Sequence, residues 1–85
     1  MLELPKSIKA KVWRELVGYD PLKDGVFDYD GCVEKLALVY NVDKAEIEEN
    51  FELHELLPAF VKAVDFVNSQ VVRGLKEIPS KKKTE

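Results

Sequence analysis

Three helix signals follow one another closely in residues 36–75, and they limit the possible folds more than any other feature of the chain. Asp43 has the side chain of a helix N-cap, and Glu46 follows three places later as in a capping box. Val42 and Ile47 are placed to pack across this helix start as a hydrophobic staple. Apolar residues then recur at steps of three and four, as on one face of a helix: Leu53, Leu56, Leu57, Phe60, Val64, Val67, Val71, Leu75 and Ile78. The stretch predicts an all-α fold and contains no catalytic pattern.

Four helices are expected, within one small domain over residues 1–78. Their ranges are about 5–17, 30–40, 43–50 and 54–77. Pro5 suits a first helical position, and Gly18 suits a helix end. Pro58 belongs in the first turn or two of the last helix. If that helix instead began upstream near Glu52, Pro58 should kink it.

The segments outside these helices are polar. Residues 18–31 hold four aspartates and three glycines, which is typical of a turn-rich connection. A short extended piece is expected within it, around Val26 and Phe27. Residues 79–85 include three consecutive lysines and are expected to form a disordered basic tail.

Length and composition favour a small soluble protein. A chain of 85 residues is near the lower limit for a domain that folds on its own core. The single cysteine, Cys32, excludes a disulfide within the chain and fits a reducing compartment. No apolar run approaches the roughly 20 residues of a membrane span, and the N-terminus does not resemble a signal peptide. We therefore expect a cytoplasmic location.

Charge is distributed unevenly along the chain. Residues 1–19 carry a net charge of +2, residues 20–55 carry −8 and residues 56–85 carry +3. An acidic middle between basic ends could let copies of the chain attract one another head to tail, as a homo-oligomer. Solvated helix faces and a solubilising tail are the simpler explanation.

No set of residues has a catalytic or metal-binding spacing. The aspartates suggest an EF-hand loop starting at Asp20, but Leu22 and Gly31 stand where such a loop needs oxygen ligands. His54 is the only histidine and Cys32 the only cysteine, which is too few for a zinc site. Neither a nucleophile–base motif nor a phosphate-binding glycine loop occurs. We predict that the protein is not an enzyme and uses no cofactor or metal.

A helix-turn-helix over residues 34–51 is the main alternative. Ala37 as the small residue, Asn41 as the turn residue and Ile47 as the later apolar residue have the spacing of that motif. Its second helix, residues 43–50, would have to approach phosphates, yet it carries four acids against one lysine. A transcription regulator is thus the second candidate, with nucleic-acid binding disfavoured. A generic helical adaptor or oligomerisation domain is the third.

With these elements in place, the chain resembles the small all-helical tail assembly chaperones of long-tailed bacteriophages. The resemblance covers roughly residues 7–75 and rests on three stretches. These are VEKLALVY at 33–40, the acidic AEIEENF at 45–51 and ELLPAFVKAV at 55–64. The turn at 40–42 departs from the family pattern, because Tyr-Asn-Val replaces the common Phe-Gly-Asn.

The resemblance implies a protein-binding role without catalysis. Such proteins bind the long helical tape measure protein before the tail tube polymerises around it, keep it soluble, and are absent from the mature virion. The implied partners are the tape measure protein and, as a second candidate, the major tail protein, in the host cytoplasm. The family also commonly makes a longer product by programmed frameshifting, and the codons of Lys81, Lys82 and Lys83 are a candidate slippage site.

Four apolar residues are our candidates for partner contacts: Trp13, Val61, Phe66 and Val72. Each lies off the main apolar stripe of its helix, so the apolar surface is wider than one packing face needs. A core position is the alternative for each, because a chain this small needs most of its large apolar groups inside. An exposed groove along the last helix would favour partner binding there. A fully closed core would leave the loops and the tail as the candidate contact surfaces.

Overall fold

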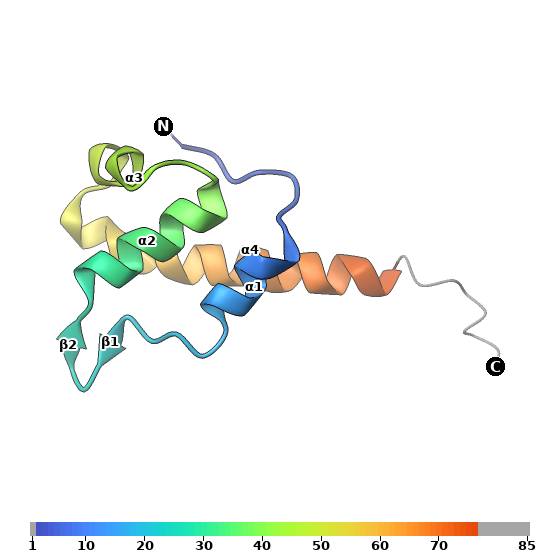
Figure 1. The fold of residues 1–85 in the computed structure, drawn as a ribbon, viewed down its shortest axis with the longest axis horizontal. Coiled ribbons are helices and arrows are strands. Elements are labelled where there is room, and N and C mark those ends of the chain that lie inside the picture. The colour runs from blue at the N-terminus through green and yellow to red at the C-terminus, as the bar shows by residue number, and fades with distance from the viewer. Residues whose placement is uncertain (1, 77–85) are drawn as a thin grey trace.

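The expected all-α fold is confirmed. The structure is a computed structural model that describes residues 2–76, which form four α-helices and one short hairpin (Figure 1). In chain order the elements are α1 (Ala10–Leu16), β1 (Leu22–Lys23), β2 (Val26–Phe27), α2 (Tyr29–Tyr40), α3 (Lys44–Asn50), the 3-10 turn η1 (Leu53–Glu55) and α4 (Leu56–Lys76). The expected tail at 79–85 and the expected helix end at residue 77 lie outside the described residues.

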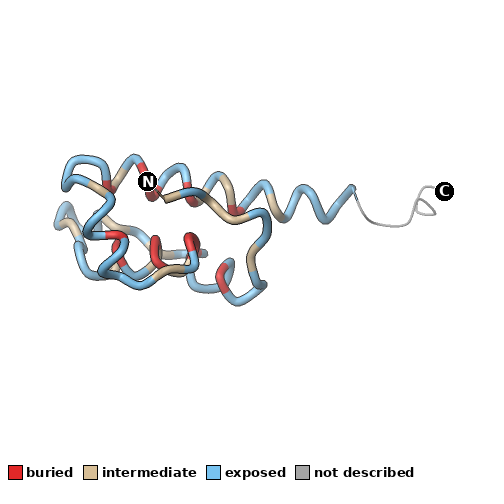
Figure 2. Tube along the Cα trace, turned by 90° about the horizontal axis from the view of Figure 1, so that it is seen from above, coloured by how far each residue is buried: buried red, intermediate tan, exposed pale blue. Residues whose placement is uncertain are grey.

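The core lies between α4 and a second layer made of the other helices (Figure 2). α1 and α2 both contact α4 and contact each other, while α3 packs on α2. The largest fully buried side chains are Leu36, Ile47, Val33, Val39 and Cys32. All of these except Ile47 come from α2, so α2 is the centre of the core.

The first helix is shorter than predicted. α1 begins at Ala10, and residues 2–8 have no helical structure although Pro5 suits a helix start. Leu2 and Leu4 pack against the core while Glu3 between them is exposed, which is the alternation of an extended chain. The Arg73 guanidinium donates a hydrogen bond of 3.0 Å to the Lys6 carbonyl and ties this segment to α4. Tertiary packing therefore outweighs the local helix signal.

The connection between α1 and α2 contains a hairpin. The expected extended piece at Val26 and Phe27 is present as β2, and it pairs antiparallel with β1, which was not predicted. Asp24 and Gly25 join the strands with φ angles of 54° and 77°. Two successive positive φ values are typical of a two-residue hairpin turn, and Asp-Gly is a sequence signal for it. This signal could have predicted the hairpin.

The junctions around α3 agree with the predicted boundaries to within a residue or two. Asn41 closes α2 in the left-handed conformation, at φ 61°. Asp43 stands at the N-cap of α3, but its side chain makes no capping hydrogen bond. Pro58 is the third residue of α4, so the structure selects the unkinked alternative. The residues just before α4 form η1. At its start, the Glu52 amide donates a hydrogen bond of 2.7 Å to Glu55 Oε1.

Candidate functional site

Three of the four candidate contact residues are exposed. Trp13 is 43% exposed, Val61 is 60% exposed and Val72 is 51% exposed. Phe66 is half-buried and packs against the core, as the alternative interpretation allowed. The structure therefore leaves a wide apolar surface uncovered by the chain's own described residues.

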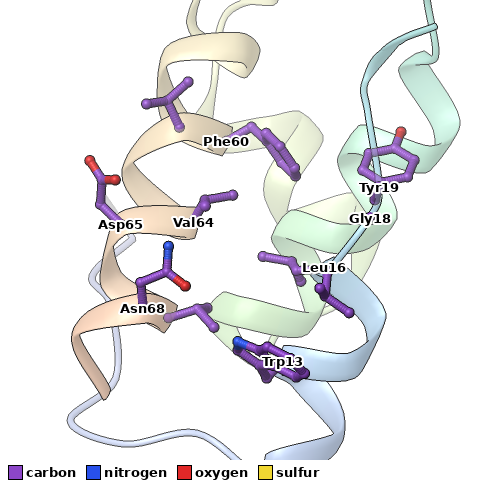
Figure 3. A pocket seen from close by; sticks show the side chains of 11 residues that line it. Trp13, Leu16, Gly18, Tyr19, Phe60, Val64, Asp65 and Asn68 are labelled. Carbon is purple, nitrogen blue, oxygen red and sulfur yellow. The ribbon is translucent and has the colours of Figure 1, made fainter. Parts of the chain in front are cut away.

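Trp13 and Val61 lie in one apolar groove between α1 and α4 (Figure 3). The groove has a volume of about 430 Å³. Its lining residues are Trp13, Leu16, Val17, Gly18, Tyr19, Phe60, Val61, Val64, Asp65, Val67 and Asn68. Buried Leu16, Phe60 and Val67 form its floor, and exposed side chains form its rim. We call this feature the α1–α4 groove.

Helical geometry explains why the other two candidates are not in this groove. Phe66 follows Val61 by five residues, which places it about 140° further round α4, on the opposite flank. Val72 follows Val61 by eleven residues, so it returns to the same flank but lies about 16 Å further along the helix. The four candidates thus separate into a groove pair, one half-buried residue packed against the core and one residue on the distal end of α4.

The distal end of α4 is the second exposed apolar feature. No residue of α4 after Val67 is buried, and residues 71–76 are all exposed. Figures 1 and 2 both show these last turns projecting beyond the other helices. Val71, Val72 and Leu75 are its large apolar side chains, and Leu75 is 63% exposed. We call these three residues the distal patch.

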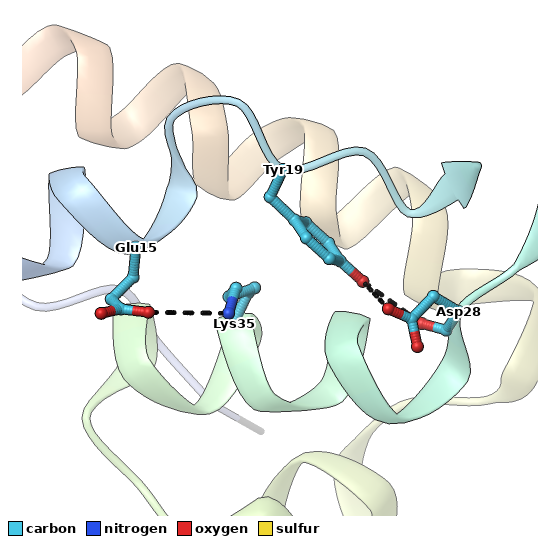
Figure 4. Close-up of polar contacts among 4 residues, drawn as sticks. All are labelled: Glu15, Tyr19, Asp28 and Lys35. Carbon is cyan, nitrogen blue, oxygen red and sulfur yellow. Dashed lines mark hydrogen bonds and ion pairs between the residues drawn. The ribbon is translucent and has the colours of Figure 1, made fainter.

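One wall of the α1–α4 groove is held by a polar cluster (Figure 4). The Tyr19 ring, which lines the groove, packs edge-on against Phe60 with centroids 5.6 Å apart. Its hydroxyl donates to Asp28 Oδ2 at 3.0 Å, and Asp28 Oδ1 accepts from the Gly31 amide at 3.1 Å. Asp28 is thereby the N-cap of α2, two residues before the predicted helix start.

A lysine supports the same ring. Lys35 Nζ lies 5.2 Å from the centre of the Tyr19 ring and 3.7 Å from Glu15 Oε1 (Figure 4). Burial, followed by the hydrogen bond to Asp28, raises the pKa of Tyr19 well above its usual value. The hydroxyl therefore stays protonated and continues to donate to Asp28 at physiological pH.

The described residues contain no cluster of metal ligands, no membrane-spanning helix and no accessible thiol. Within residues 2–76, no three His, Cys, Asp or Glu side chains are grouped to hold a metal ion. None of the helices in this same range is long and apolar enough to cross a membrane. Cys32 is fully buried, with its sulfur 3.9 Å from the Leu56 carbonyl oxygen.

The Cys32 thiol should react slowly in the folded protein. Burial, with a smaller contribution from Asp28, raises the pKa of Cys32 from 9.0 to about 11. At pH 8 this lowers the thiolate fraction about 100-fold, and burial restricts access further. A disulfide-exchange reagent should therefore label the native chain at least that much more slowly than the chain in denaturant. Equal rates would contradict the buried position.

The raised pKa of Cys32 also predicts how the stability of the fold changes with pH. Because the folded pKa lies above the unfolded one, the folded state holds its thiol proton more tightly. This contribution is fully present below pH 9 and is lost as the pH rises from 9 to about 11. A Cys32→Ser variant should lack this component of the alkaline loss in urea unfolding experiments.

No protein-family model, curated protein sequence or solved structure matches this chain. The features of this chain that bear on its function are the α1–α4 groove, the distal patch and the three sequence stretches that resemble tail assembly chaperones.

Proposed function

We propose that this protein is a tail assembly chaperone that binds the tape measure protein of a bacteriophage and keeps it soluble before the tail tube polymerises. The observation that carries the proposal is the open α1–α4 groove, lined by large apolar side chains from two helices. A small helical protein whose core closed completely would have no such surface to offer.

The groove has the chemistry of a helix-binding site. Amphipathic helices bind in apolar grooves through side chains spaced at three and four residues. Trp13 lines the groove, and tryptophan is one of the residue types enriched among energetically dominant interface contacts. A long helical protein with uncovered apolar faces aggregates, so many copies of a small protein covering those faces would keep it in solution.

The charge of this chain indicates which charge the residues beside the apolar stripe of a partner helix should carry. Asp65 lies on the groove rim, and the chain as a whole carries a net charge of −3. A partner helix with lysine or arginine beside its apolar stripe would therefore associate faster than one with acidic flanks.

A single exposed residue tests the proposal. Val61→Asp places a charge on the groove rim, where the side chain is already exposed, so the fold should remain intact. In co-expression with the tape measure protein of the same genome, the wild-type chain should keep that protein soluble, whereas Val61→Asp should leave most of it in the pellet. A carboxylate placed against the apolar face of a bound partner helix should weaken binding tenfold or more.

Val26→Asp is the matched control. Val26 is 69% exposed and lies on the hairpin, away from the groove lining. This variant should keep the tape measure protein as soluble as the wild-type chain does. A tape measure protein that is equally soluble with wild-type chain, with Val61→Asp and without any chaperone would contradict the proposal.

The regulator alternative is disfavoured by the surface of α3. Its exposed charged residues are Lys44, Glu46, Glu48 and Glu49, so a helix meant to read DNA would present more acids than bases. We expect no mobility shift of duplex DNA at physiological salt. A slippery heptamer at the codons of residues 81–83, with an overlapping second frame, would further support the chaperone proposal.

A further inference from the structure

We propose that the free protein forms a two-fold symmetric dimer in which the distal patch of each copy occupies the α1–α4 groove of the other. The inference uses the groove of the proposed function, but it requires no client protein. The groove of each copy is occupied by the other copy of this chain, and the two copies pair through antiparallel α4 helices.

The distal patch has the chemistry that the groove selects. Val71, Val72 and Leu75 follow the spacing of three and four residues that a groove-binding helix uses. They are exposed on a helix end that projects beyond the body of the protein (Figure 1). The groove of the same copy lies on the same rigid helix, about two turns earlier, so the patch cannot fold back into it. Only another copy can bring the two features together.

Groove and patch lie on one side of α4. At 100° per residue, Val64 of the groove and Leu75 of the patch differ by about 20° in direction, because they are eleven residues apart. One strip along α4, apolar except at Asn68, therefore has the groove at one end and the patch at the other. Two such strips placed antiparallel bring each patch against the opposite groove, which is the self-complementary arrangement that two-fold dimers use.

The register follows from the spacing. Placing Leu75 of one copy opposite Val64 of the other puts the two-fold axis between residues 69 and 70 of α4. The same register places Val71 opposite Asn68, so the patch of one helix covers the α4 side of the groove on the other. Trp13 and Val17, on α1, then flank the incoming helix.

Charges on the flank of the strip agree with this register. Asp65 and Lys76 are also eleven residues apart, so they share one flank of α4. In antiparallel pairing, Asp65 of one copy lies about 3 Å along the axis from Lys76 of the other, within reach of the lysine side chain. The two-fold axis repeats this pair, so each dimer gains two complementary contacts.

Sedimentation equilibrium of the full chain, without any client, tests the dimer. The wild-type chain should be dimeric at about 100 μM and dissociate on dilution. Leu75→Asp should raise the dimer dissociation constant at least tenfold, because a carboxylate would enter an apolar groove. Leu53→Asp is the matched control, since Leu53 is 71% exposed but lies on η1, outside both features. It should leave the constant unchanged.

A charge exchange tests the register itself. Asp65→Lys and Lys76→Asp should each weaken the dimer several-fold, and the double variant should return it to near the wild-type value. A monomer at about 1 mM, a dimer that Leu75→Asp leaves intact, a double variant no better than the single ones, or open-ended oligomers would each overturn the inference. Client binding that persists while the dimer is absent would leave the proposed function standing, because the sedimentation experiment contains no client.

Discussion

Replacing Leu36 by alanine should lower the free energy of unfolding by about 3 kcal/mol. Leu36 is fully buried at the centre of α2, the helix that contacts each of the other three. Removing three carbon atoms there loses their burial and leaves a cavity that four packed helices cannot fill completely. For a chain of this length the whole free energy of unfolding is roughly 4–13 kcal/mol, so this single change removes a large part of it.

Urea and thermal unfolding measure the effect. A loss of this size should lower the melting temperature by roughly 12–24 °C in a domain below 100 residues. Leu53→Ala makes the same chemical change at an exposed position and should alter the free energy of unfolding by no more than about 0.5 kcal/mol. Equal effects at the two positions would show that α2 is not the centre of the core.

Replacing Gly31 by alanine should destabilise the fold by about 2 kcal/mol, although alanine is the better helix former. Gly31 is in the first turn of α2, and a Cβ there would overlap the Asp28 carboxylate and the Tyr19 hydroxyl. Those two groups hold the N-cap of α2 and one wall of the α1–α4 groove. The substitution must push this hydrogen-bonded cluster apart.

Gly74→Ala provides the opposite result within the same protein. Gly74 is exposed in α4, and nothing lies within 4 Å of the position that its Cβ would take. Alanine there should leave stability unchanged or raise it by up to about 1 kcal/mol, since helix propensity then acts alone. Chemical denaturation of both variants decides the point, and a stabilising Gly31→Ala would contradict the described packing of Tyr19 on Asp28.

Local patterns were sufficient for most of the helices. The apolar stripe over 53–78 predicted α4, and Pro58 fell in its first turn as one of the two stated alternatives required. The boundaries of α2 and α3 were predicted to within a residue, because Asn41 and Asp43 are residue types that favour helix ends and helix starts.

Contacts between distant residues explain what local patterns missed. Pro5 favoured a helix over residues that instead pack as an extended segment, which Arg73 of α4 ties through the Lys6 carbonyl. Asp28 became the N-cap of α2 with its carboxylate held by Tyr19, nine residues earlier. The Asp24-Gly25 turn is the exception, because its own sequence carried the signal.

The chain's own sequence determined its helical class, the number of its helices and the residues that are apolar beyond the needs of one packing face. These properties depend on residue spacing and on side-chain chemistry within a few turns. Only the tertiary structure decided that Trp13 and Val61 share a groove while Phe66 packs inward. The reason is that a groove is made by the angle and offset between two helices, which depend on how all of their side chains pack together.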